Sequence, residues 1–228
     1  MRSRNDAWAA VVADYEARPD GAQPCALGDQ LIAHPDGAEL QVPAFYILGF
    51  NGGETADQSP LHGERPTRSA RRWFDLCERA ARAVRVSSWG ITERCHWGSP
   101  DISTLIRRLG SRAAVRQLLK LHADANLALF RETPPLVVWV TGLGWLAETI
   151  EDYGLTAVGE PEQRQAPLKG ILWRHFVAND GTPYLFSRHP TGARFAKGEH
   201  ERLFEKLGQL ASGRIAVAGV VWTGIAAG

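Results

Sequence analysis

The chain has 228 residues, 44% of them hydrophobic, which suits a single domain with a sizeable core. Its formal net charge is only +1, so a nucleic acid would have to be held by a local basic face. The three cysteines, Cys25, Cys77 and Cys95, never form a Cys-x-x-Cys pair, which argues against a disulfide framework, a zinc ribbon and an iron–sulfur cluster.

The two ends of the chain carry no targeting pattern. Ala7, Val11 and Tyr15 predict an amphipathic N-terminal helix rather than a signal peptide. The apolar C-terminal stretch, residues 215–228, is too short and too rich in glycine to span a bilayer. We therefore expect a cytoplasmic monomer without membrane contact. Its single domain would have an N-terminal helical and extended appendage (1–40), a core (41–212) and a C-terminal strand or tail (213–228).

The first part of the core predicts strands alternating with helices. Residues 44–48 form an apolar strand that ends at Gly49, and a helix follows over residues 67–83. A strand over 84–88 and a loop over 89–101 lead to a helix over 103–122. Residues 136–140 are a continuous apolar run, typical of a strand buried on both faces, and a helix over 143–153 follows.

The second part of the core predicts a β-hairpin, a helix and a possible last strand. The hairpin strands are residues 170–177 and 183–187, joined by an Asp180-Gly181 turn. The helix covers 196–210 and the strand 215–222. The whole pattern predicts an α/β fold of three αβα layers around a central, mostly parallel sheet. Ligands of such folds bind beyond the carboxyl ends of the strands.

Two loops that follow predicted strands carry motifs. Gly49-Phe50-Asn51-Gly52-Gly53 resembles the first signature of the uracil-DNA glycosylase superfamily, and His189-Pro190-Thr191-Gly192 resembles the second. Their order and the strand-helix units between them extend the resemblance over about residues 40–212. It is strongest to the asparagine-type branch, with its single-strand-selective and mismatch-specific members. The resemblance implies a monofunctional DNA glycosylase that hydrolyses the N-glycosidic bond of a flipped-out uracil or modified pyrimidine, leaving an abasic site.

The resemblance also implies roles for particular residues. Asn51 would orient the attacking water, and His189 would donate a hydrogen bond to the departing pyrimidine. The pocket for the base would be lined by Phe50, Gly52, Glu93, His96 and Trp97. A backbone phosphate would be held by Thr191, Gly192, Arg194 and Lys197, with backbone amides as donors. No metal ion, iron–sulfur cluster or other cofactor is expected.

Basic residues recur every fourth position along the helix predicted over residues 103–122. Like charges at this spacing destabilise an isolated helix, so this face is either a phosphate-binding groove for DNA or an ordinary solvated surface. The four residues are Arg108, Arg112, Arg116 and Lys120. A second basic stretch contains Arg65, Arg68, Arg71 and Arg72.

The first motif departs from the family pattern. Gly52 stands where many relatives carry proline, and Gly53-Glu54 stands where uracil-specific members have a bulky tyrosine. This implies an open pocket that accepts a larger pyrimidine, such as a modified cytosine of phage DNA. Two alternatives remain: a catalytically silent DNA-binding module, and a hydrolase of free nucleosides or nucleotides. Thr141-Gly142-Leu143-Gly144 lacks the third glycine and the acidic residue of a dinucleotide site.

Overall fold

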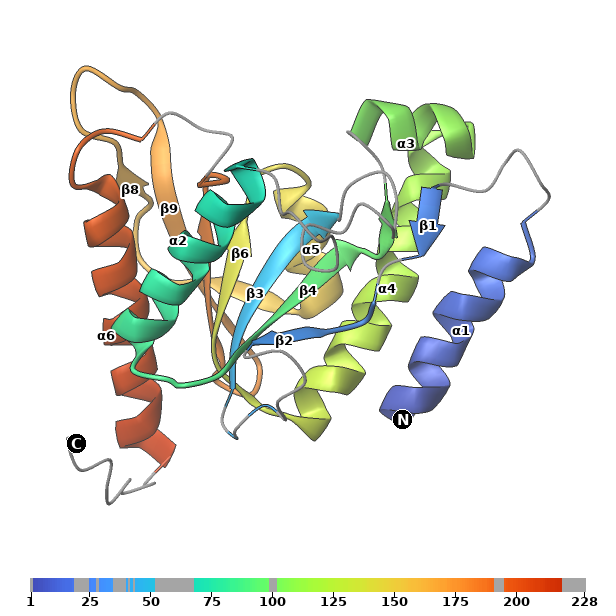
Figure 1. Cartoon of the computed structure of the whole chain (residues 1–228), viewed down its shortest axis with the longest axis horizontal. Helices are drawn as coiled ribbons and strands as arrows, with labels where there is room; N and C mark the ends of the chain where they lie inside the picture. The colour runs from blue at the N-terminus through green and yellow to red at the C-terminus, as the bar shows by residue number, and fades with distance from the viewer. Residues whose placement is uncertain are drawn as a thin grey trace.

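The computed structural model describes residues 2–18, 25–27, 29–34, 40, 42, 44–51, 68–98, 102–190 and 195–218. Within these residues an eight-stranded mixed sheet lies between helices (Figure 1). Its strand order is β2-β4-β3-β6-β10-β9-β7, and β8 pairs with β9 off this path. A separate two-stranded sheet joins β1 to β5.

The centre of the large sheet is parallel. Its four central strands are β4 (Trp89–Cys95), β3 (Ala44–Asn51), β6 (Pro135–Thr141) and β10 (Pro183–Ser187). Antiparallel strands flank them: β2 (Ile32–His34), β9 (Ile171–Ala178), β7 (Leu155–Ala157) and β8 (Glu162–Gln163). The small sheet consists of β1 (Cys25–Leu27) and β5 (Trp97–Gly98). The carboxyl ends of the four parallel strands therefore meet at one edge, which is the upper edge in Figure 1.

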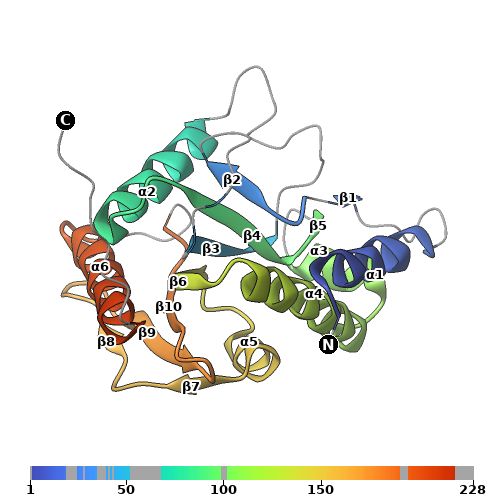
Figure 2. The same ribbon diagram turned by 90° about the horizontal axis from the view of Figure 1, so that it is seen from below.

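Helices cover both faces of this sheet (Figure 2). One face is packed by α2 (Arg68–Val84) and α6 (Glu199–Ala218), the other by α4 (Arg112–Glu132) and α5 (Leu146–Tyr153). Outside α4 lie α1 (Arg4–Glu16) and α3 (Ile102–Leu109).

Alternation along β3 separates the two cores. Phe45 and Ile47 pack toward α2 and α6, whereas Tyr46 and Leu48 pack toward α4 and α5. The predicted α/β class is confirmed, with a mixed sheet whose parallel centre is compatible with three αβα layers.

Several predicted elements are confirmed. The helix over 67–83 corresponds to α2, the buried strand over 136–140 to β6, and the hairpin to β9 and β10. In the hairpin turn Gly181 has a φ of +81°, which glycine adopts without strain, and the Thr182 amide donates to Asp180 Oδ1.

The strand predicted over residues 84–88 is wrong. Val84 ends α2, Arg85 has a φ of +65°, and the strand begins only at Trp89. Glu93 consequently lies within β4, where the sequence predicts a loop. The polar residues of β4 hide the strand from pattern analysis, because Thr92 and Arg94 are buried through hydrogen bonds to distant parts of the chain.

The helix predicted over residues 103–122 is two helices. Gly110, with a φ of +80°, ends α3, and the Ser111 hydroxyl accepts a hydrogen bond from the Ala114 amide at the start of α4. The strand predicted over 215–222 is also wrong for 215–218, which belong to α6, while 219–222 lie outside the described residues.

Candidate active site

Both motif loops leave the sheet at the edge where the parallel strands end. Asn51 is the last residue of β3 and pairs with Cys95, the last residue of β4. Ser187 ends β10 beside Thr141 at the end of β6, and His189 follows two residues later. Only the backbone of Asn51 is described, and Gly52 and Gly53 lie outside the described residues. The parallel topology thus brings two motifs that are far apart in sequence to one edge.

The ring of His189 stacks on Trp73 of α2. Their centroids are 5.2 Å apart and the ring planes are inclined by 23°. Trp73 also packs on Trp139 of β6, at a centroid distance of 5.9 Å. Burial and the positive charge of Arg94 lower the pKa of His189 below its usual value. His189 is therefore a neutral imidazole near pH 7, a form that can donate one hydrogen bond without carrying charge.

Glu93 of β4 places its carboxyl over Gly49 of the neighbouring strand. The two residues are paired in register, and a methyl group added at Gly49 would lie only 2.7 Å from Glu93 Cδ. Glu93 Oε2 is buried and accepts no hydrogen bond from the described residues. Burial raises the pKa of Glu93 to about 8, against a smaller opposing effect of Arg94. The side chain is therefore largely a neutral carboxylic acid at pH 7.

Two further polar side chains, Thr141 and Ser187, lie in line with Glu93 and Gly49, on the face of the sheet that packs against α2. By alternation from Val137 and Trp139, Thr141 faces α2 and α6, and its Oγ1 is buried without a hydrogen-bond partner among the described residues. Next to it, Ser187 Oγ accepts a hydrogen bond from Trp139 Nε1 at 2.9 Å. The ends of the four parallel strands thus carry what we call the strand-end row: Glu93, Gly49, Thr141 and Ser187.

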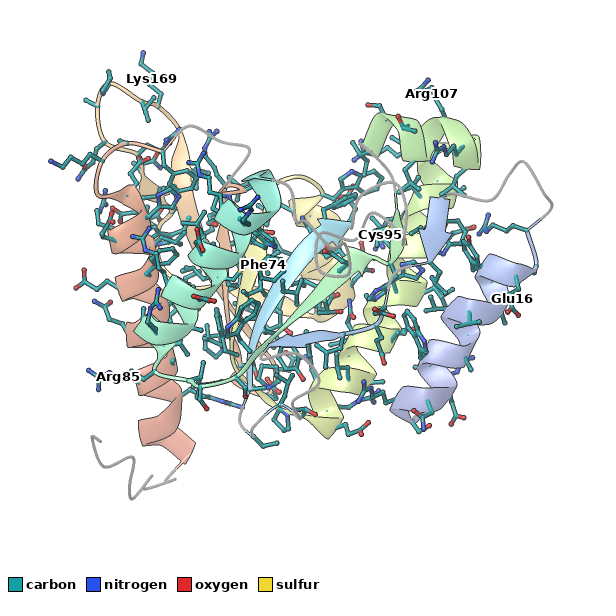
Figure 3. All side chains as sticks on the ribbon, in the orientation of Figure 1. Glu16, Phe74, Arg85, Cys95, Arg107 and Lys169 are labelled. Carbon is teal, nitrogen blue, oxygen red and sulfur yellow. The ribbon has the colours of Figure 1, made fainter. Side chains whose placement is uncertain are left out.

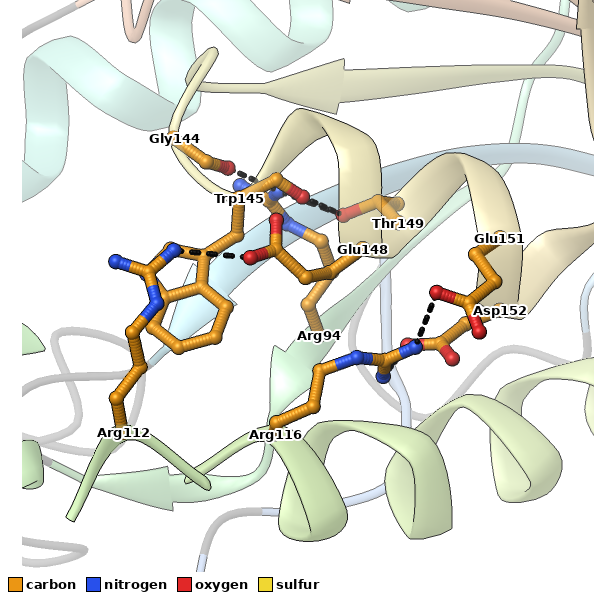
Figure 4. Close-up of polar contacts among 9 residues, drawn as sticks. All are labelled: Arg94, Arg112, Arg116, Gly144, Trp145, Glu148, Thr149, Glu151 and Asp152. Carbon is orange, nitrogen blue, oxygen red and sulfur yellow. Dashed lines mark hydrogen bonds and ion pairs between the residues drawn. The ribbon is translucent and has the colours of Figure 1, made fainter. Parts of the chain in front are cut away.

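Arg94 ties the strand ends together from the opposite face. Its Nε donates to the Gly49 carbonyl at 3.3 Å, and Nη2 donates to the Thr141 carbonyl at 3.2 Å. Its Nη1 donates to the Gly144 carbonyl at 2.8 Å and to Thr149 Oγ1 at 3.2 Å (Figure 4). Burial lowers the pKa of Arg94 to about 10, so the guanidinium stays charged at neutral pH.

Three other residues predicted to line the base pocket, Phe50, His96 and Trp97, lie on the α4 side. Phe50 packs its ring against the Arg94 guanidinium, 5.0 Å from the ring centroid. His96 is 2% exposed, and its Nε2 lies 3.2 Å from Asn126 Oδ1 of α4. Trp97 is fully buried in the cluster formed with α3 and α4. His96 and Trp97 therefore belong to the core in this structure, whereas Glu93 lies at the strand-end site.

Two of the arginines predicted to form a DNA groove, Arg112 and Arg116, make ion pairs within the protein. Arg116 binds Asp152 at 2.6 Å and Glu151 at 3.1 Å, both on α5. Arg112 binds Glu148 at 2.9 Å, and its guanidinium lies over the ring of Trp145 (Figure 4). These ion pairs stabilise the packing of α4 against α5. A phosphate-binding role for Arg112 and Arg116 stays a prediction. Arg108 lies on α3, so the break at Gly110 also divides the predicted row.

The predicted phosphate loop lies largely outside the described residues, which include neither Thr191, Gly192 nor Arg194. Lys197 is described and exposed. Helix α6 begins at Glu199, whose buried carboxylate accepts from the Ala196 amide at 2.7 Å and binds Arg164 at 2.7 Å. The start of this helix is thus capped by the protein itself.

Four exposed basic side chains lie at or just before the starts of α2, β9 and α6. Arg71 and Arg72 lie in the first turns of α2, close to Trp73. Lys169 precedes β9, whose first residues pair with the end of β10, and it projects from the upper end of the molecule (Figure 3). With Lys197 these residues form what we call the basic rim.

Trp73, Thr141 and Arg94 are site residues that the sequence does not single out. Trp73 reads as part of the apolar face of a helix, and Arg94 as a residue of a loop. Thr141 reads only as the start of a glycine-rich segment. The usable signal is alternation, since Thr141 is two residues beyond the buried Trp139 at the end of a strand.

No protein-family model matches this chain, and a search of curated proteins finds no match either. Among the described residues, no helix is long and apolar enough to cross a membrane. The same residues contain no group of three or more His, Cys, Asp or Glu side chains that could hold a metal ion.

Proposed function

We propose that this chain is a DNA glycosylase of the uracil-DNA glycosylase superfamily that hydrolyses the N-glycosidic bond of a modified pyrimidine. The observation that carries the proposal is the meeting of the two motifs at one edge of the parallel sheet, with the His189 ring stacked on Trp73. The neighbouring side chains of Glu93 and Thr141 supply polar groups for a base, and each buries an oxygen that has no hydrogen-bond partner among the described residues.

The proposed chemistry separates the charges that develop as the bond breaks. Asn51 holds a water molecule on the sugar side, because an amide can orient water without removing its proton beforehand. The neutral His189 donates a hydrogen bond to the pyrimidine oxygen, on which negative charge grows as the base departs. A flipped-out nucleotide places its glycosidic bond beside Asn51 and His189, and its phosphates contact the basic rim.

The test is base release from a panel of DNA duplexes that contain uracil, thymine mismatches, 5-hydroxymethylcytosine or its glucosylated form. Alkali cleaves the resulting abasic sites, and the fragments are resolved by electrophoresis. We expect cleavage by the wild type at one class of pyrimidine, and its loss in Asn51→Ala and His189→Ala with retained DNA binding. The exposed Glu132→Gln at the end of α4 serves as a control that keeps wild-type cleavage.

One observation favours a second candidate, a hydrolase of free nucleosides or nucleotides. Arg112 and Arg116 pair with acidic residues of α5, so the face expected to hold DNA is partly neutralised. Such a hydrolase would release the base from a nucleoside as readily as from DNA, and its activity would vary little with salt. The glycosylase loses DNA affinity steeply as salt rises.

A further inference from the structure

Two side chains of the strand-end row bury an oxygen without using its hydrogen-bonding capacity. Glu93 Oε2 and Thr141 Oγ1 have no hydrogen-bond partner among the described residues. Gly49 lies between their strands, since it pairs with Glu93 on one side and follows the Leu48–Val140 pair on the other. Buried polar atoms are nearly always paired in folded proteins, and those that are not point to a ligand or a catalytic role.

The surroundings of Glu93 favour a carboxyl group that keeps its proton. The charge of Arg94 of β4 lowers the pKa of Glu93. The charge of Glu93 in turn raises the pKa of two thiols, Cys95 of β4 and Cys77 of α2. Arg94 points to the other face, where carbonyl groups and the Thr149 hydroxyl take up its donors, and no ion pair to Glu93 is formed there. Both thiols are themselves buried and neutral, because burial raises the pKa of each. Glu93 therefore presents both a donor and an acceptor.

We propose that Glu93 is the general acid that protonates ring nitrogen N3 of a 4-aminopyrimidine, so that the substrate of this site is a cytosine-type base; the inference rests on the function proposed above. A neutral carboxyl matches the cytosine edge, where the N3 acceptor lies beside the 4-amino donor. Uracil has a hydrogen on N3 and departs as a delocalised anion, so it does not need this proton.

The step balances without a cofactor. The bond between C1′ and N1 breaks with its electron pair on N1, while the carboxyl O–H bond of Glu93 breaks and an N3–H bond forms. The base leaves neutral and Glu93 is left as a carboxylate. Water held by Asn51 adds to C1′, and the proton it loses returns to Glu93 through solvent. General acid catalysis of this kind contributes about 100- to 10,000-fold in rate.

The test compares 5-hydroxymethylcytosine with 5-hydroxymethyluracil at the same position of one duplex, with the released base quantified by mass spectrometry under single-turnover conditions. We expect Glu93→Gln to lose at least about 100-fold on the cytosine substrate and less than about 10-fold on the uracil substrate. Glu132→Gln, an exposed change at the end of α4, is the matched control and keeps both rates.

The pH profile of the wild type supplies a second readout that needs no variant. Its rate on the cytosine substrate should fall tenfold per pH unit above about 8, where the carboxyl of Glu93 loses its proton. Equal losses on both bases in Glu93→Gln, or a profile that is flat to pH 10, would overturn the role of Glu93. Release of 5-hydroxymethyluracil alone by the wild type would overturn the cytosine assignment and leave the glycosylase proposal standing. Release of no base from these two duplexes or from any duplex of the panel above would overturn both.

Discussion

The carboxyl group of Glu93 occupies the space in which Gly49, its partner in the adjacent strand, would carry a side chain. Glycine at this position therefore does more than permit a turn, because Gly49 is part of a regular strand without positive φ. Because Gly49 has no side chain, the carboxyl group of Glu93 lies near the end of β3. Asn51 is two residues further along β3, and its backbone pairs with Cys95. The first glycine of the motif is thus explained by packing rather than by backbone conformation.

Gly49→Ala should displace the carboxyl of Glu93 with little loss of stability. The atoms in the way belong to the far end of a flexible side chain, so we expect a change in unfolding free energy of less than about 1 kcal/mol. Base release should fall at least about tenfold, since the acid is no longer positioned. The control is Gly213→Ala in α6, where an added methyl meets nothing within 4 Å. Loss of activity in both variants, or in neither, would contradict this account of Gly49.

Glu93→Gln should stabilise the protein at neutral and alkaline pH. The pKa of Glu93 rises from 4.5 to about 8 on folding, so the unfolded chain releases its proton first and the folded state loses stability as pH rises from about 4.5 to 8. A glutamine removes this penalty. We expect a gain of about 1–3 kcal/mol at pH 8 that vanishes near pH 4.5, measured by urea unfolding. A variant less stable than wild type at pH 8 would show that the carboxylate is paired in the native state.

Trp73→Leu should raise the pKa of His189 toward its usual value. The stacked indole excludes water from the imidazole, and without it the charged form is better solvated. NMR titration of the His189 ring measures this shift. The acid limb of the activity profile should move to higher pH with it, because less of the imidazole is neutral. Trp8→Leu, beside His96 rather than His189, should leave the His189 titration unchanged.

Arg116→Ala should weaken folding and leave DNA affinity almost intact. Asp152 is 4% exposed and would lose its partner, at a cost of about 1–3 kcal/mol in unfolding free energy. By contrast, Arg72→Ala and Lys169→Ala in the basic rim should each lower the slope of log affinity against log salt by about 0.9 for every phosphate that the variant no longer binds. A steep fall in DNA affinity for Arg116→Ala alone would restore the α4 face as the groove.

The sequence predicts the elements whose signals are local. The apolar run of β6 and the Asp180-Gly181 turn are recognisable from their own residues, and so are the two motifs at strand ends. The strand β4 escapes prediction because Thr92 hydrogen-bonds Asn126 of α4, 34 residues away, and Arg94 reaches carbonyls of other strands. No local pattern reports such partners.

The site is predictable only in part for the same reason. In the sequence, Arg112 and Arg116 belong to a regularly spaced row of basic residues. Only the folded structure shows that each of them forms an ion pair with an acidic residue of α5. His96 and Trp97 lie near Glu93 in sequence, yet they are buried on the side of α4. Which residues of a strand share a face depends on where the strand begins, and the predicted boundaries of β4 are wrong.

The most direct test of the central claim is to count released bases and abasic sites in the same reaction on DNA with a modified cytosine. The account predicts one free base for each abasic site with the wild type, and neither product with Asn51→Ala or His189→Ala although both variants still bind the DNA. If the wild type binds DNA but releases none of the pyrimidine bases tested, the account is contradicted and the chain is identified as a silent DNA-binding module.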